Sequence, residues 1–177
     1  GTSHEVQLRL SFDEAITGIE TSVTSGTGSG KSKAVKIRIH AGVEDGTRLR
    51  LKGKGGHGTD GGPNGDLIVI IRVSDHEIFG REGKNLTVNM PVSFIDAALG
   101  TDIEVPTYHD GSKKLRLPAG TQTGSVFRVK GGGIQDSESD GDLLVTVNIT
   151  VPKDLTKTQR TALENLEELF TEDTPDT

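Results

Sequence analysis

The chain has 177 residues, which is enough for one ordinary domain or two small ones. It has no cysteine, which excludes disulfides and thiolate zinc ligands, and its net charge of −6 has the wrong sign for a nucleic-acid partner. No apolar run approaches the ~20 residues of a membrane span, and no secretory leader is recognisable. We therefore expect a cytoplasmic protein with no cofactor, no nucleic-acid partner and no membrane contact.

Alternation of apolar and polar residues with a period of two predicts a series of β-strands. The segments with this alternation are, in chain order, 6–10, 35–39, 49–51 and 126–129. Two denser apolar runs, 67–71 and 143–147, are typical of central strands. Glycine-rich turn signals separate these segments. The pattern predicts an all-β fold.

An internal duplication is the most informative feature of the sequence. The block at 41–53 (AGVEDGTRLRLKG) recurs at 119–131 (AGTQTGSVFRVKG). Each copy is followed by a glycine-rich loop and then by the triplet Gly-Asp-Leu, at 65–67 and at 141–143. The chain is therefore expected to contain two copies of one small β unit.

The duplication also includes a short segment upstream of each block. Residues 11–18 (SFDEAITG) recur as 93–100 (SFIDAALG), and each copy is typical of a short helical turn ended by glycine. The seam between the two units is predicted near 74–85. Two small cores also account for the low hydrophobic fraction of 31%, because small units bury less of their surface.

A single helix is predicted at the C-terminus, over 153–171. Thr156 and Gln159 have the spacing of a capping box. An apolar stripe with helical spacing follows, and it consists of Leu155, Ala162, Leu163, Leu166, Leu169 and Phe170. The acidic segment 172–177 is expected to be a disordered tail.

The segment 25–32 (SGTGSGKS) nearly matches a nucleotide phosphate-binding loop. It lacks the first glycine, and the alternation at 35–39 predicts a strand after it, where such a loop needs a helix. A flexible Gly/Ser linker is the better interpretation. The five histidines share no metal-ligand spacing, and no Gly-x-Ser-x-Gly motif occurs, so we expect neither a metal site nor an enzyme.

Basic residues concentrate in the first half of the chain, with eight of the twenty Lys and Arg residues between Lys31 and Lys54. On alternating strands they are typical of a solvated face, and a patch for an acidic peptide tail is the alternative. The apolar residues of the same strands are typical of a core. An exposed sheet edge beside aliphatic side chains could also accept an extended peptide as an added strand.

Several motifs together resemble the C-terminal substrate-binding region of the DnaJ family of co-chaperones. They are the duplicated block, the two Gly-Asp-Leu triplets, residues 76–83 (HEIFGREG) and residues 91–94 (PVSF). The likeness runs from about Val6 to Phe170. It implies two tandem, internally duplicated β-sandwich-like domains, 4–75 and 76–152, followed by a dimerisation helix at 153–171.

The resemblance also implies that parts of the family pattern are missing. The zinc-containing branch carries a cysteine-rich finger where this chain has the Gly/Ser segment at 25–30, so the finger is either deleted by engineering or absent from a natural zinc-free relative. Zinc is expected only with that finger. The J domain and its His-Pro-Asp motif are also missing, so no stimulation of a DnaK-type ATPase is expected.

The function that the resemblance implies is the binding of unfolded client polypeptides, which add as a strand to the first domain and are delivered to a DnaK-type chaperone. The peptide-binding positions carried over from the family are Val23, Val35, Ile37, Leu67 and Val69, with two further pocket positions at His4 and Ser25. A Val69→Asp substitution is expected to abolish peptide binding and to leave the fold intact.

The apolar stripe of the helix predicts a homodimer. The dimerisation residues are expected to be Leu163, Leu166, Leu169 and Phe170. The alternative function, from a different class, is a structural self-assembly module with exposed sheet edges.

Overall fold

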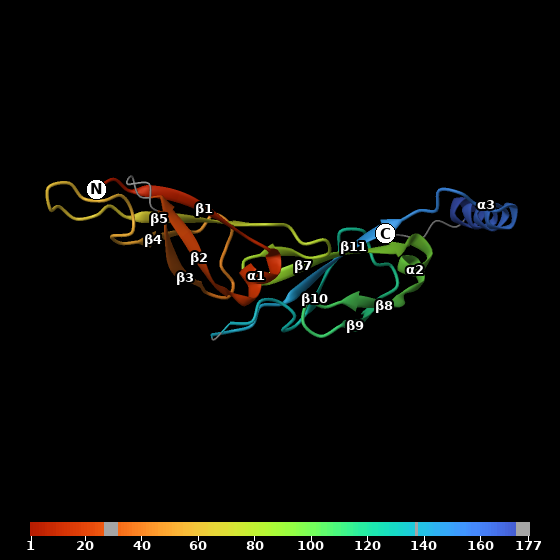
Figure 1. Ribbon diagram of the computed structural model, residues 1–177. Helices are drawn as coiled ribbons and strands as arrows, with labels where there is room; N and C mark the ends of the chain where they lie inside the picture. Colours follow the sequence, from red (N-terminus) through yellow and green to blue (C-terminus); the bar gives the residue numbers. More distant parts are fainter. Residues whose placement is uncertain (27–31, 137, 173–177) are drawn as a thin grey trace.

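The computed structural model describes residues 1–26, 32–136 and 138–172. Figure 1 shows two strand-rich bodies that follow one another along the chain, with the helix α3 at the far end from the N-terminus. Each sheet takes its strands from one half of the described chain. The expected all-β architecture with a C-terminal helix is confirmed.

The first domain consists of two small sheets packed on each other. One sheet has the order β1–β5–β4, in which β1 (His4–Leu10) is parallel to β5 (Leu67–Val73) and β4 (Arg48–Leu51) is antiparallel to it. The other is the antiparallel hairpin of β2 (Ile19–Gly26) and β3 (Ser32–Ile39). The core between them consists of Leu10, Ala15, Val23, Ile37, Ile39, Leu67, Val69 and Ile71.

The second domain repeats this architecture with one added strand. Its strands are β6 (Gly80–Glu82), β7 (Asn85–Ser93), β8 (Thr101–Pro106), β9 (Ser112–Leu117), β10 (Val126–Val129) and β11 (Leu143–Thr150). The larger sheet has the order β10–β11–β7–β6, and β11 is parallel to β7 as β5 is to β1. The hairpin β8–β9 is the counterpart of β2–β3. The additional strand β6 lies at the junction of the two domains.

The two short helices predicted from the repeat are present with matching caps. Their N-cap and C-cap residues are Ser11 and Gly18 for α1 (Phe12–Thr17), and Ser93 and Gly100 for α2 (Phe94–Leu99). Gly18 has φ +82°, and a Cβ atom there would lie 2.8 Å from the carbonyl oxygen of Ile39. Glycine is therefore required where the chain leaves the helix and enters the hairpin.

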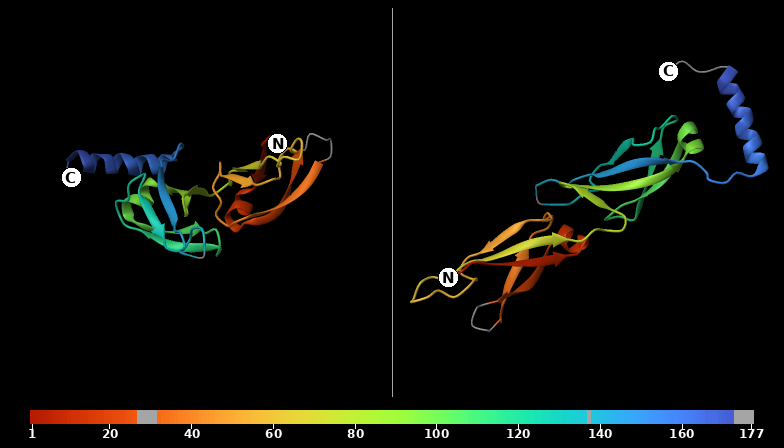
Figure 2. Two further views of the ribbon diagram at one scale, coloured as in Figure 1. Left: turned by 90° about the vertical axis from the view of Figure 1, so that its left-hand side faces the viewer. Right: turned by 90° about the horizontal axis from the view of Figure 1, so that it is seen from above.

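The C-terminal helix α3 (Lys157–Glu172) begins four residues later than expected. The capping box is formed, because the Gln159 amide donates to Thr156 Oγ1 at 3.1 Å and the Thr156 amide donates to Gln159 Oε1 at 2.9 Å. Thr156 is thus the cap, and the residues before it belong to the connection from β11. In Figure 2 the helix projects away from the second domain. The tail predicted after it lies outside the described residues from 173 onward.

Candidate functional site

The five residues predicted to bind peptide lie together in the first domain. Val23 and Val35 face each other across the β2–β3 hairpin, Ile37 follows on β3, and Leu67 and Val69 lie on the central strand β5. Leu67 and Val69 have an exposed fraction of 0%, and Val23 and Ile37 are buried as well. Val35 is only half-buried. Four of the five therefore belong to the core, and Val35 is the one that reaches the surface.

Val35 borders a surface cavity of about 530 Å³ between β3 and the glycine-rich loop after β4. Its lining residues are Lys33, Ala34, Val35, Lys36, Gly53, Lys54, Gly55, His57 and Asn64. Several of these side chains are cationic, so the apolar surface of Val35 is flanked by positive charge. Of the two further pocket positions, His4 is half-buried at the start of β1, and the side chain of Ser25 lies outside the described part of the chain.

The equivalent hairpin of the second domain has no apolar pair at this position. In β8–β9 the pair that corresponds to Val23 and Val35 is Val105 and Lys113. Lys113 is exposed, and Val105 is fully buried. At this position of the hairpin, only the first domain has an aliphatic side chain at the surface. Aligning the repeat at an offset of 78 residues would have revealed this difference in the sequence.

A carboxylate anchors the loop that borders the cavity. Asp66 accepts hydrogen bonds from the Gly53 amide at 3.0 Å and from Arg50 Nε at 2.6 Å. The Gly53 bond is the main cause that lowers the pKa of Asp66, and Arg50 adds to it. The second domain repeats the anchor with Asp142, the Gly131 amide at 2.8 Å and Arg128 Nη1 at 2.6 Å.

Acid is expected to loosen these anchors. The pKa values of Asp66 and Asp142 lie below the usual 3.8, and the Lys84 ammonium lowers that of Asp136 to about 2. A lowered folded-state pKa contributes stability that is complete above the unfolded-state pKa and is lost as the pH falls through the folded-state value. The urea midpoint should therefore be constant above about pH 5 and fall between about pH 4 and 2.

An Asp142→Asn variant provides the control for this prediction. It should have a lower urea midpoint at neutral pH and a smaller loss of midpoint on acidification, because asparagine can accept the Gly131 bond but carries no charge. An acid response identical to that of the unaltered chain would contradict the assignment.

The residues predicted to dimerise form a mostly exposed face of α3. Leu166, Leu169 and Phe170 have exposed fractions of 43%, 61% and 53%, and Leu163 is half-buried. Phe170 also lines a surface cavity together with Phe94 of α2 and residues of its own second domain. An apolar helix face exposed to this degree is typical of an interaction surface.

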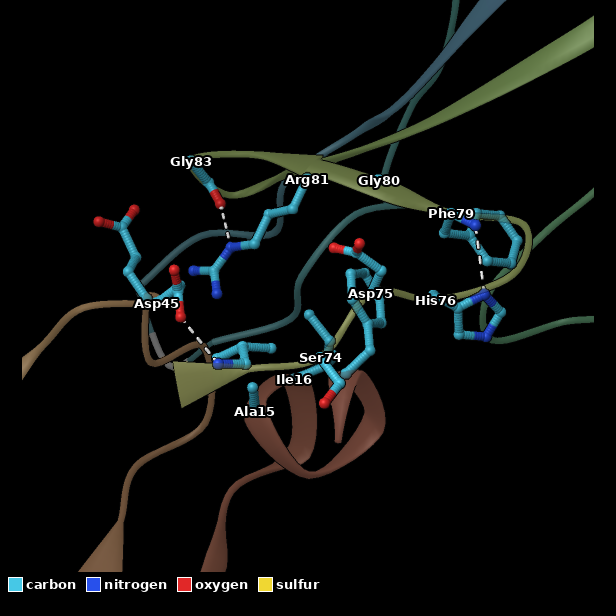
Figure 3. Close-up of a pocket in the computed structure, with 13 residues that line it drawn as sticks. Ala15, Ile16, Asp45, Ser74, Asp75, His76, Phe79, Gly80, Arg81 and Gly83 are labelled. Atoms are coloured by element: carbon cyan, nitrogen blue, oxygen red, sulfur yellow. Dashed lines mark hydrogen bonds between the residues drawn. The ribbon is translucent and has the colours of Figure 1, made fainter. Parts of the chain in front are cut away.

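The seam near 74–85 was predicted from the sequence, but the side-chain contacts across it were not. Phe12 and Ile16 of α1 are buried in the core of the second domain. The Phe12 ring centroid lies 5.2 Å from that of His76, in a tilted pair, and 6.0 Å from that of Tyr108, in an edge-on pair. A cavity of about 390 Å³ lies there, and Figure 3 shows Ile16, His76 and Arg81 around it. The repeat could not reveal this contact, because α1 and α2 have similar sequences but, in the described chain, only α1 is followed by another β domain against which it can pack.

Other kinds of site find little support. Within residues 1–26, 32–136 and 138–172, no group of three His, Asp or Glu side chains is placed to hold a metal ion. The near-match to a phosphate-binding loop overlaps 27–31, which lie outside the described residues, and the strand β3 follows it. No described helix is long and apolar enough to cross a membrane.

Fold and site together define a protein of two tandem β domains with an aliphatic surface beside an open hairpin in the first and a helix after the second. Residues 4–152 match the family of the DnaJ C terminal domain. The chain belongs to the DnaJ C-terminal domain family, as the motifs indicated.

Curated relatives from several bacteria have similar sequences. Chaperone protein DnaJ 2 of Cutibacterium acnes is 50% identical over 145 residues, which are 81% of this chain and 38% of the relative. Chaperone protein DnaJ of Rhodopirellula baltica is 51% identical over 147 residues, 81% of this chain and 37% of the relative. Chaperone protein DnaJ of Exiguobacterium sp. is 46% identical over 141 residues, which are 78% of this chain and 38% of the relative. The chain thus spans less than two fifths of the length of these relatives.

Proposed function

We propose that this chain is the client-binding part of a co-chaperone and that it holds unfolded polypeptides on its first domain. The observation that carries the proposal is the Val23–Val35 pair at an open hairpin, where the second domain has Lys113 in place of Val35. Membership of the DnaJ C-terminal domain family supports it.

The hairpin offers backbone groups that an extended peptide can use. Among the described residues, β2 and β3 pair as strands only with each other, so each leaves one edge open. A client strand added to an edge gains backbone hydrogen bonds that do not depend on its sequence. A client Leu or Phe placed against Val35 would add roughly 1.5–3 kcal/mol. Affinity at one such site stays modest, because association itself costs several kcal/mol.

The assembly proposed for this function is a homodimer joined through α3. Two arms would bind two segments of one client, and the gain in effective concentration would compensate for weak single sites. In the full-length protein the client would pass to a DnaK-type chaperone. The proposal needs no cofactor, catalytic residue, nucleic acid or membrane, and it places the protein in the cytoplasm.

The alternative of a self-assembling module has a physical objection. The strands at the sheet edges carry cations: Arg48 and Arg50 on β4, Lys33 and Lys36 on β3, and Lys113 and Lys114 on β9. Basic side chains on edge strands oppose pairing with another copy of the same strand.

The substitution Val35→Lys tests the proposal, since it gives the first domain the residue that the second domain already carries. The fold should survive, because the second domain accommodates Lys113 at this position and a lysine stem can lie along an apolar surface. The affinity for hydrophobic peptides should fall about tenfold or more, since at least about 1.4 kcal/mol of contact is lost. Fluorescence titration with several unrelated labelled peptides measures it.

Lys113→Ala is the matched control, and it should leave every peptide affinity unchanged. Circular dichroism melting of both variants checks the fold. If Val35→Lys is folded and binds all the peptides with unchanged affinity, the Val35 surface is not the peptide-binding site.

A further inference from the structure

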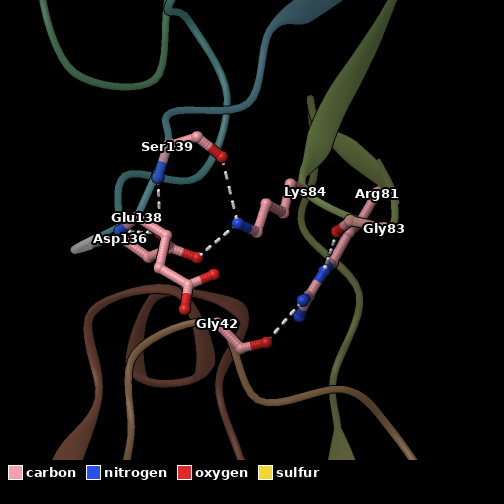
Figure 4. A network of polar contacts seen from close by, with 7 residues as sticks. All are labelled: Gly42, Arg81, Gly83, Lys84, Asp136, Glu138 and Ser139. Atoms are coloured by element: carbon pink, nitrogen blue, oxygen red, sulfur yellow. Dashed lines mark hydrogen bonds and ion pairs between the residues drawn. The ribbon is translucent and has the colours of Figure 1, made fainter.

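Arg81 links the two domains through backbone carbonyl groups. It lies on β6, the strand that the first domain lacks. Its Nη1 donates to the carbonyl oxygen of Val43 at 2.6 Å, and its Nη2 donates to that of Gly42 at 2.5 Å. Both acceptors belong to the first domain, in the turn after β3. Figure 4 shows the guanidinium reaching from the second domain to Gly42.

The fork of Arg81 is itself held in place. Its Nε donates to the carbonyl oxygen of Gly83 at 2.8 Å, so all three nitrogens that can donate are used. A planar guanidinium held at three points fixes direction as well as distance, which an ammonium group cannot do. The approach is close on the other side too, because a Cβ atom on Gly42 would lie 3.3 Å from Ile134 of the second domain.

Two other contacts join the domains, and Phe12 and His76 of the second contact line the same cavity as Arg81. The hydroxyl of Tyr108 in the second domain donates to Asp13 of α1. Desolvation raises the pKa of Tyr108, and this bond raises it further. The ring of Phe12 packs against His76, whose Nδ1 accepts the amides of Ile78 at 3.0 Å and Phe79 at 3.2 Å. Several contacts between different residues resist rotation of one domain against the other, whereas a single contact would allow it.

The geometry points to Arg81 as a positioning residue that sets the orientation of the first domain relative to the second. It thereby determines where the Val35 surface lies with respect to the helix α3. The importance of this placement for client binding rests on the function proposed above. Client segments separated by a particular length of chain would then bind best, since effective concentration is highest when the linker matches the span.

A distance measurement tests the orientation independently of peptide binding. The chain has no cysteine, so Gln7→Cys on β1 and Asn148→Cys on β11, both at exposed positions, give two unique sites for fluorescent labels. Labelled protein mixed with a large excess of unlabelled protein places one labelled copy in each dimer. Single-molecule energy transfer should give one narrow distribution for the unaltered chain and a clearly broader one for Arg81→Ala.

Matched variants separate loss of the fork from loss of charge or of stability. Arg81→Lys keeps the positive charge but lacks the planar guanidinium, so it should broaden the energy-transfer distribution as Arg81→Ala does. If the Arg81→Ala protein does not fold, Arg81→Lys takes its place in the test. Arg128→Ala removes an arginine bond within the second domain and should leave the distribution narrow. A narrow distribution in both Arg81 variants would overturn the inference.

Peptides with two hydrophobic segments provide the functional readout. The affinity of the unaltered dimer should pass through a maximum as the linker between the segments is lengthened, and in Arg81→Lys this maximum should flatten at least threefold. Affinity for a one-segment peptide should not change. If no peptide binds the unaltered chain, the proposed function fails while the distance measurement still decides the role of Arg81. A sharp maximum retained in Arg81→Lys would also count against that role.

Discussion

Replacing Val69 by aspartate should unfold the first domain. Val69 has an exposed fraction of 0% and lies between Val6 of β1 and Leu49 of β4, on the strand at the centre of the sheet. A carboxylate there has no partner, and the cost of burying it is several kcal/mol, a large share of the roughly 5–15 kcal/mol that stabilises a typical protein. The expectation that Val69→Asp would leave the fold intact is therefore replaced, and the variant reports on folding.

The second domain provides the matched variant, because Val145 occupies the same place in β11 and is also fully buried. The two substitutions should differ in which domains they destabilise. Phe12 and Ile16 contribute to the core of the second domain, whereas the core of the first domain consists of its own residues. Val69→Asp should destabilise both domains, since loss of Phe12 alone removes about 1.5–3 kcal/mol of burial from the second. Val145→Asp should leave the first domain folded.

Hydrogen–deuterium exchange resolved along the chain distinguishes these outcomes. In Val69→Asp, protection should be lost over β1–β5 and reduced over β7 and β11. In Val145→Asp, protection should persist over β1–β5. Equal loss in both variants, or full protection of β5 in Val69→Asp, would contradict the described arrangement of the two cores.

Local patterns in the sequence were sufficient to predict most of the fold. The alternation in β1, β3 and β4 arises because one face of each strand is buried, and that cause acts at every second residue. The repeated glycines were equally informative: Gly42 and Gly120 both have φ +83°, and Gly46 and Gly124 both have φ +84°. Where a backbone conformation with positive φ recurs, glycine recurs in the sequence at the same position, and the repeat can be recognised from it.

Contacts between distant segments could not be predicted in this way. Phe12 and Ile16 have the spacing of a helix that covers its own domain, yet they are buried in the next one. The carbonyl groups that Arg81 binds have no sequence signature, because every residue carries one. The predicted peptide-binding set shows the same limit. Alternation identified its apolar residues correctly, but only the packing separates the half-buried Val35 from the fully buried Leu67.

Introducing aspartate at both Leu166 and Leu169 should convert the proposed dimer into monomers. Both side chains are exposed in the single chain, so the substitutions cost the monomer little, whereas a dimer interface would have to bury four carboxylates. Loss of four leucine contacts at roughly 1.5 kcal/mol or more each would raise the dissociation constant well over a hundredfold. Phe170 is left unchanged, because it also lines a cavity with its own second domain.

Sedimentation equilibrium at tens of micromolar protein measures the effect. The unaltered chain should sediment at twice 18.8 kDa and the double variant at 18.8 kDa. The control introduces the same residue on the opposite face of α3, as Glu164→Asp with Glu168→Asp, and it should remain dimeric. If the unaltered chain sediments only at 18.8 kDa, α3 does not join two copies, and the avidity that the proposed function relies on must come from another surface. If only the control dissociates, the polar face of α3 forms the interface, and the assignment of the apolar face is wrong.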